Sequence, residues 1–154
     1  LLEKGVQLHG NKAAYLSHEP CHNPMKQQDT MTTVKALVDE QVIDNARCCG
    51  ESGTLAVARP DVSTQVRFRK EEEIQKGVAQ LRENFDLPAD GNVKILTSCP
   101  ACLQGLMRYE GDLQNGLLEP DYIVIEMAKQ ILGENWLPEF VATANQGGIE
   151  RVLV

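Results

Sequence analysis

Short apolar segments alternate along this chain with longer segments in which apolar residues recur at helical spacing. We expect strands at 13–18, 42–48, 93–97 and 122–125. We expect helices at 29–40, 62–84, 101–109, 127–132 and 138–145. In the first helix, for example, Val34, Leu37 and Val38 fall at positions i, i+3 and i+4. Strands that alternate with helices predict an α/β domain with a mostly parallel sheet flanked by helices.

The length and the charge of the chain limit the classes of protein to which it can belong. Its 154 residues suit a single domain, 1–154, in which we expect residues 110–154 to form a helical extension packed on the rest. The 15 basic and 22 acidic residues give a net charge of −7, which argues against nucleic-acid binding. No apolar run approaches the roughly 20 residues of a transmembrane segment, and no signal peptide is recognisable, so we expect a cytoplasmic protein. Because the chain opens with Leu1 rather than Met, we expect it to be the C-terminal fragment of a longer protein.

Five cysteines lie in three groups, each in a predicted loop or directly after a predicted strand. The groups are a lone cysteine, an adjacent pair and a C-x-x-C motif: Cys21, Cys48 with Cys49, and Cys99 with Cys102. An odd number excludes a complete set of disulfides, and clustered thiols in a reducing cytosol more often bind metal or carry out redox chemistry. Since the carboxyl ends of parallel strands share one edge of a sheet, we expect the three groups to converge there.

The C-x-x-C motif is predicted to begin a helix directly after a strand. Pro100, inside the motif, suits the first turn of that helix. The free backbone N–H groups and the positive end of the helix dipole favour thiolate, the form that binds metals or attacks disulfides. Taken alone, the motif fits a metal site or a thiol–disulfide pair in which Cys99 attacks and Cys102 resolves.

The adjacent pair is more informative about the kind of metal centre. Neighbouring residues project their side chains apart, so Cys48 and Cys49 are awkward ligands for one tetrahedral zinc ion. They suit a polynuclear iron–sulfur cluster better, because each thiolate can bind a different iron atom. Gly50 lets the backbone pass close to the sulfurs, and Gly50 and Gly53 place N–H groups that would tune the potential of such a cluster.

Two polar segments near these motifs carry weaker signals. In the segment 18–22, a lone histidine such as His18 is more often a hydrogen-bonding loop residue than a ligand. His22, next to Cys21, is placed to donate to a cluster sulfur or to replace a ligand. In the segment 67–70, Arg-Phe-Arg-Lys, three following glutamates cancel the positive charge and favour a solvated helix face over an anion site.

The order of these motifs resembles the cysteine-rich CCG domain family, which includes the heterodisulfide reductase B subunit and the iron–sulfur subunits of glycolate and lactate oxidases. The family pattern falls on Cys21, Cys48-Cys49-Gly50 and Cys99-Pro100-Ala101-Cys102. The resemblance covers residues 13–109. The segment 126–154 is similar to the C-terminus of large bacterial FAD- or FMN-linked oxidoreductases akin to D-lactate dehydrogenases.

The resemblance implies an iron–sulfur domain that relays electrons within a flavin-dependent oxidoreductase acting on a 2-hydroxy acid. The five cysteines would bind the cluster, whether [4Fe–4S], non-cubane or [2Fe–2S]. FAD and substrate oxidation would belong to a flavin domain of the same polypeptide or complex, so this fragment would hold no catalytic residue. Two other classes stay open: a scaffold in which Cys99, Cys102 and one or two more cysteines bind zinc, and a thiol–disulfide redox protein.

Overall fold

A four-stranded parallel sheet forms the centre of the molecule. The computed structural model describes residues 14–23, 27–38, 41–51, 54–112 and 118–146. The strands are β1 (Ala14–Ser17), β2 (Val42–Asp44), β3 (Val93–Thr97) and β4 (Leu118–Tyr122). Their order across the sheet is β2-β1-β3-β4, and every neighbouring pair is parallel. The predicted α/β class is therefore confirmed.

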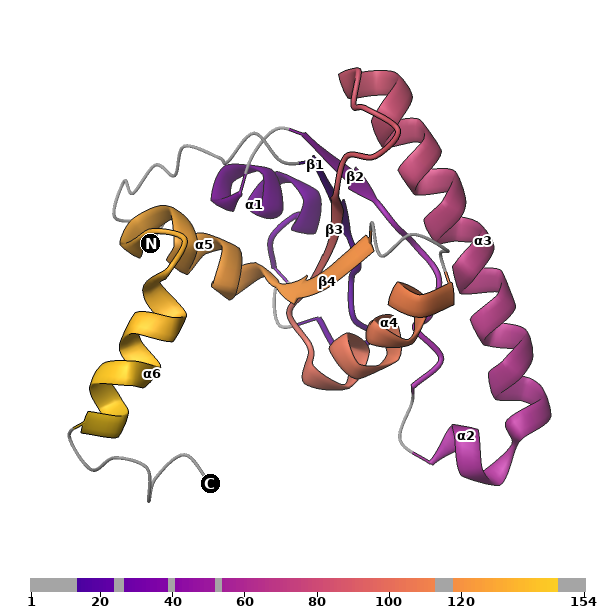
Figure 1. The fold of residues 1–154 in the computed structure, drawn as a ribbon. Coiled ribbons are helices and arrows are strands. Elements are labelled where there is room, and N and C mark those ends of the chain that lie inside the picture. Colours follow the sequence, from indigo (N-terminus) through magenta and orange to yellow (C-terminus); the bar gives the residue numbers. More distant parts are fainter. Residues whose placement is uncertain (1–13, 24–26, 39–40, 52–53, 113–117, 147–154) are drawn as a thin grey trace.

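Helices connect the strands and cover both faces of the sheet (Figure 1). They are α1 (Thr30–Leu37), α2 (Leu55–Ala58), α3 (Pro60–Phe85), α4 (Pro100–Asp112), α5 (Ile123–Leu132) and α6 (Trp136–Gln146). In Figure 1, α1 and α5 lie on one side of the strands and α3 lies on the other. Within the described residues, no helix is both long enough and apolar enough to span a membrane.

Alternating strand residues divide the core between these two faces. Leu16 and Ile95 point to the face covered by α3 and α4, whereas Tyr15 and Leu96 point to the face covered by α1 and α5; all four are fully buried. The partners on the first face include Ile74, Leu81 and Leu106, and those on the second include Val34, Val38 and Ile123. The period of two along a strand thus gives each face its own apolar layer.

The fourth strand lies earlier in the chain than the sequence predicts. The expected strand at 122–125 is wrong, because the strand is Leu118–Tyr122 and α5 begins at Ile123. Pro120 is tolerated since β4 is an edge strand, where a missing N–H can face away from the sheet. Ile123 and Glu126 are three residues apart and both buried, which is the spacing of one helix face.

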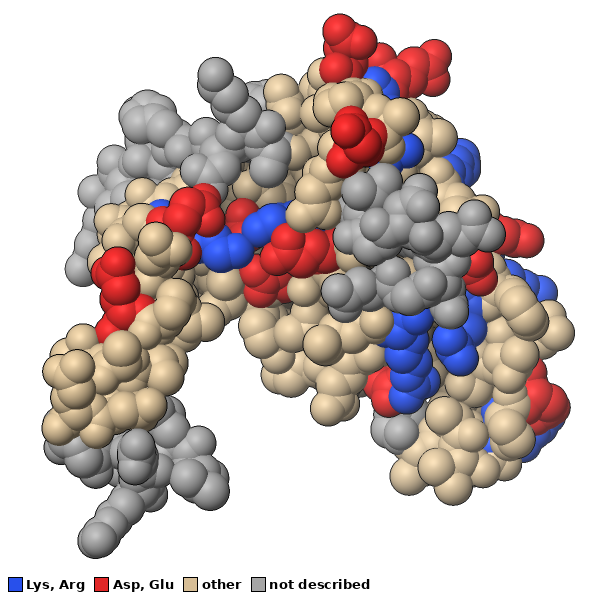
Figure 2. Space-filling model, in the orientation of Figure 1, with Lys and Arg blue, Asp and Glu red and all other residues tan. Residues whose placement is uncertain are grey.

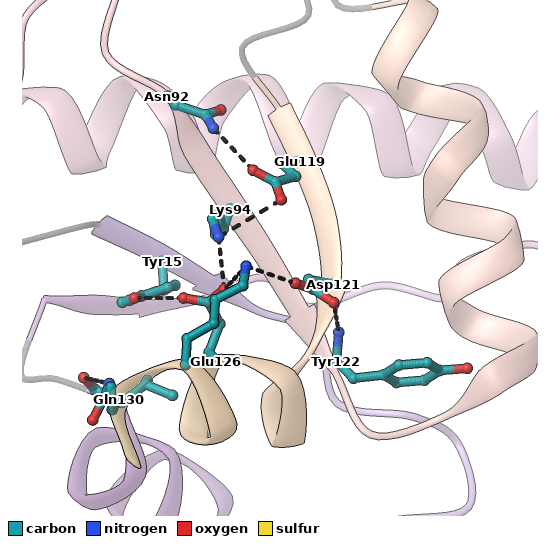
Figure 3. Close-up of polar contacts among 10 residues, drawn as sticks. Tyr15, Asn92, Lys94, Glu119, Asp121, Tyr122, Glu126 and Gln130 are labelled. Atoms are coloured by element: carbon teal, nitrogen blue, oxygen red, sulfur yellow. Dashed lines mark hydrogen bonds and ion pairs between the residues drawn. The ribbon is translucent and has the colours of Figure 1, made fainter. Parts of the chain in front are cut away.

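A buried carboxylate joins α5 to the sheet on this second face (Figure 3). Glu126 is 1% exposed and accepts hydrogen bonds from Lys94 Nζ at 2.6 Å, Lys129 Nζ at 2.8 Å and the Tyr15 hydroxyl at 3.0 Å. Lys129 also lies 3.5 Å from Asp121 of β4. At the surface between α5 and β4, acidic and basic side chains lie side by side (Figure 2). Residues of β1, β3, β4 and α5 therefore share one polar network.

Candidate metal centre

The three cysteine groups meet at the carboxyl-terminal edge of the sheet. Cys21 follows β1, the adjacent pair follows β2, and the C-x-x-C motif follows β3 and opens α4. The sulfurs of Cys49 and Cys102 are 3.5 Å apart, and both residues are buried. The Cys99 thiol influences the pKa of Cys102, and the Cys48 and Cys49 thiols influence the pKa of Cys21. The three cysteine groups therefore gather at one edge of the sheet, as the parallel order of the strands leads us to expect.

A histidine that the sequence does not single out shares this site. His18 directly follows β1 and is 3% exposed, and its backbone N–H donates to the Leu96 carbonyl at 2.8 Å. Ligand atoms of His18, Cys49 and Cys102 all lie within 4.8 Å of one another. Ligands around a tetrahedral zinc ion are about 3.5–4 Å apart, given metal–ligand distances of about 2.0–2.3 Å. The three buried side chains can therefore contact one metal ion.

The position of His18, two residues after Leu16 of β1, indicates which face of the sheet its side chain lies on. Residues two apart on a strand point to the same face, so His18 continues the row of Leu16, which faces the core shared with Cys49 and Cys102. His22, the histidine expected to assist a cluster, is exposed. Its predicted role stays a prediction, as do the ligand roles of the five cysteines. Gly53 and the segment 147–154 lie outside the described residues.

A buried lysine lies next to the site, and the expected solvated face at 67–70 is wrong for this residue, Lys70. Phe68 and Arg69 are exposed, but Lys70 is fully buried. The Lys70 ammonium donates to the Asn45 side-chain oxygen at 2.6 Å, to the Asn45 carbonyl at 2.9 Å and to the Ala46 carbonyl at 2.8 Å. Its Nζ lies 3.1 Å from His18 Nδ1. The loop after β2 thus supplies the oxygen atoms that make this burial possible.

This contact distinguishes the two ring nitrogens of His18. Nδ1 is the nitrogen next to Lys70 Nζ, at 3.1 Å, and Nε2 is the other ring nitrogen. Burial, and then the positive charge of Lys70, lowers the pKa of His18 to about 4. Burial also lowers the pKa of Lys70 to about 8. At neutral pH the imidazole is therefore neutral, as a metal ligand must be, and the lysine is mainly charged.

The thiols differ in their readiness to ionise. Backbone N–H groups at the start of α4, chiefly that of Cys102, lower the pKa of Cys99. Burial, followed by the neighbouring Cys49 and Cys99 thiols, raises the pKa of Cys102. The charge of Cys48 raises the pKa of Cys21 in the same way. Neighbouring thiolates repel one another, so a bound cation would favour the ionised form of these thiols.

The loop around Gly50 is held closely against α3 and α4. Gly50 has a φ of +80°, a left-handed conformation that favours glycine, and its N–H points to Cys48 Sγ at 3.4 Å. A Cβ on Gly105 of α4 would lie 3.0 Å from Glu51 Cβ and 3.2 Å from the Cys49 carbonyl oxygen. Glu51 also forms a two-point ion pair with Arg108, at 2.8 and 3.0 Å. The Gly50 backbone therefore passes close to a cysteine sulfur, as the sequence predicts.

Comparison with known proteins locates one described family at the C-terminal end. A domain of unknown function (DUF3400) matches residues 107–154. This segment contains β4, α5 and α6, and it lies beyond all five cysteines. No curated protein and no solved structure matches the chain. The matched family is not the CCG family and its residues do not include the cysteines, so the resemblance to the CCG family depends on the cysteine pattern alone.

Proposed function

We propose that this domain binds an iron–sulfur cluster and transfers electrons within a flavin-dependent oxidoreductase that acts on a 2-hydroxy acid. The observation that carries the proposal is the gathering of the three cysteine groups at one edge of the sheet, where the Cys49 and Cys102 sulfurs lie 3.5 Å apart. Five thiols exceed the four ligands of a mononuclear zinc site, and they include the four thiolates that a cluster uses. The flavin, FAD, and the substrate would belong to another part of the parent protein or complex.

The residues present fit such a group chemically. Thiolates are the ligands of iron–sulfur clusters, and N–H groups near the sulfurs adjust their potential. The Gly50 N–H lies 3.4 Å from Cys48 Sγ, and the free N–H groups that open α4 lie beside Cys99. Cys21 is exposed, whereas Cys49 and Cys102 are buried. One end of the thiol group therefore lies at the surface and the other lies in the core.

Each side chain has a distinct part in this proposal. When bound, the cluster would accept one electron at a time from a reduced flavin, which is oxidised in the same step, and pass it on. Cys49 and Cys102 would hold it from the protein side, and Cys99 is the thiol whose lowered pKa readies it for ligation. The exposed Cys21 marks the side of the site that lies nearest to solvent and to an electron-transfer partner.

Anaerobic reconstitution with iron and sulfide tests this function. We expect a brown protein that contains iron and acid-labile sulfide and that gives an electron paramagnetic resonance signal on reduction. Cys49→Ser and Cys102→Ser should lower the iron content strongly. Ser98→Ala, which changes an exposed neighbour of Cys99, should leave it unchanged. A wild-type protein that takes up no sulfide would contradict the proposal.

The buried triad favours one second candidate, a structural zinc site. Ligand atoms of His18, Cys49 and Cys102 lie within 4.8 Å of one another, and Cys99, whose thiol influences the pKa of Cys102, would complete a closed set of four. The two candidates differ in colour and in metal content. A colourless protein with one zinc ion per chain and no sulfide supports the scaffold, and chelation of that zinc should then lower the melting temperature.

A further inference from the structure

Lys70 is a buried positive charge without a negative partner of the usual kind. It is fully buried in the middle of α3, and its hydrogen-bond acceptors are two carbonyl oxygens, one amide oxygen and one imidazole nitrogen. All of these acceptors are neutral. Among the residues that the structure describes, no carboxylate forms an ion pair with this ammonium.

A buried charge in neutral surroundings is unfavourable unless a charge of opposite sign lies close by. Two nearby carboxylates are poorly placed to supply this opposite charge, because Glu73 lies 3.7 Å from Arg47 and Asp44 is exposed. The group that most strongly opposes the effect of burial on the pKa of Lys70 is Cys49, and Glu73, Asp44 and Cys102 follow in that order. The missing counter-charge of Lys70 is therefore to be sought in the thiol group.

The contact with His18 places the ammonium directly behind the site. Lys70 Nζ lies 3.1 Å from His18 Nδ1, and His18 shares the triad with Cys49 and Cys102. Because an ammonium has no lone pair, Lys70 cannot itself bind a metal while charged. It acts on the centre through its charge and by orienting the imidazole, which makes it a positioning residue.

We propose that Lys70 is the built-in counter-charge of the metal centre: it favours a centre of net negative charge and raises the reduction potential of that centre. This inference rests on the proposed iron–sulfur function. A [4Fe–4S]²⁺ cluster bound by four thiolates has a net charge of −2, whereas Zn²⁺ bound by three thiolates and a neutral imidazole has a net charge of −1. A fixed positive charge in low-dielectric surroundings stabilises added negative charge, so it makes the uptake of an electron more favourable.

Two substitutions remove this charge in different ways. Lys70→Met deletes the ammonium and keeps most of the side-chain length. Asn45→Asp keeps the lysine in place but puts a carboxylate oxygen where the amide oxygen now lies, 2.6 Å from Nζ, so that the charge is neutralised locally. The matched control is Lys76→Met, which removes an exposed lysine from the same helix.

The measurement is the midpoint potential of the reconstituted proteins, from redox titrations followed by electron paramagnetic resonance. We expect more negative potentials in Lys70→Met and Asn45→Asp than in the wild type, and an unchanged potential in Lys76→Met. If Lys70→Met does not fold, Asn45→Asp decides the question, because it retains the size and shape of the residue. A cluster-loaded Asn45→Asp variant with the wild-type potential would overturn the role of Lys70 alone. A wild-type protein that binds no cluster would refute the proposed function, and this inference with it.

Discussion

Replacing Glu126 by Gln tests how much the C-terminal segment contributes to the stability of the sheet. Glu126 is 1% exposed and accepts from Lys94 and Lys129 at 2.6 and 2.8 Å and from Tyr15 at 3.0 Å. Glutamine has nearly the same shape but no charge, and its NH₂ group cannot accept a hydrogen bond. The substitution leaves two ammonium groups facing each other without their shared counter-ion.

The expected loss follows from the burial of the three groups. Removing one partner of a buried ion pair costs about 3–5 kcal/mol of unfolding free energy. The side chains of Lys94 and Lys129 are 15% and 16% exposed, so water solvates part of their charge and reduces this cost. We therefore expect the lower end of the range, about 3 kcal/mol. For a chain of this size, that corresponds to a fall of roughly 6–12 °C in melting temperature.

Thermal unfolding followed by circular dichroism measures this effect, and Glu119→Gln is the matched control. The Glu119 side chain is 43% exposed and lies 3.6 Å from the same Lys94. An exposed pair of this kind contributes about 0–1 kcal/mol. If the two variants lose the same stability, the network around Glu126 does not support the sheet and the reasoning is wrong.

The pH dependence of stability gives an independent check on Glu126. Burial alone would raise the pKa of Glu126, but hydrogen bonds from Lys129 and Lys94 outweigh it and hold the pKa below the ordinary value of 4.5. The stabilising contribution is therefore complete above pH 4.5 and is lost as the pH falls through the lowered folded-state pKa. Urea unfolding of Glu126→Gln should show a smaller loss of stability on acidification below pH 4.5 than the wild type.

Three further predictions concern the site and its support. Gly50→Ala forces a side chain into the left-handed region at φ +80° and should cost about 1–2 kcal/mol in urea unfolding, with reduced iron uptake on reconstitution. Gly77→Ala places a Cβ 2.9 Å from both Leu16 Cδ2 and Asn45 Nδ2, so it should lower the unfolding free energy by about 1–3 kcal/mol; an unchanged urea midpoint would contradict this packing. The pKa of His18 is about 4 in the folded protein, against an ordinary value of 6.5. The contribution of the neutral imidazole to the unfolding free energy of the metal-free protein should therefore be complete above pH 6.5, and it should be lost as the pH falls from 6.5 to 4. The same urea titration of His18→Asn should lack that slope.

Local patterns in the sequence were sufficient to predict the parts of the fold that depend on neighbours in the chain. The strand Val93–Thr97 has the predicted bounds, and the helix after it begins at Pro100, where proline is favoured. The side chain of Asp29 caps α1 by accepting from the Thr32 N–H at 2.7 Å. The convergence of the cysteines follows from the same information, since it requires only that the strands be parallel.

Contacts between distant segments explain what the sequence did not predict. The burial of Lys70 depends on oxygen atoms at Asn45 and Ala46, which only the folded loop after β2 brings to it. Three glutamates following in the chain made a solvated face the better interpretation, because a run of charged residues does not show which of them faces the sheet. Likewise, β4 contains Glu119, Pro120 and Asp121, and it pairs as a strand because β3 offers a free edge.

Only a few residues separate each cysteine group from the end of the strand that precedes it. Cys21 is four residues beyond the end of β1, Cys48 is four beyond the end of β2, and Cys99 is two beyond the end of β3. The long connections lie elsewhere, in helices that return the chain to the opposite edge of the sheet. Residues added to or removed from the turns at that opposite edge would therefore leave the sulfur positions intact, whereas a single residue inserted between a strand end and its cysteine would displace a ligand.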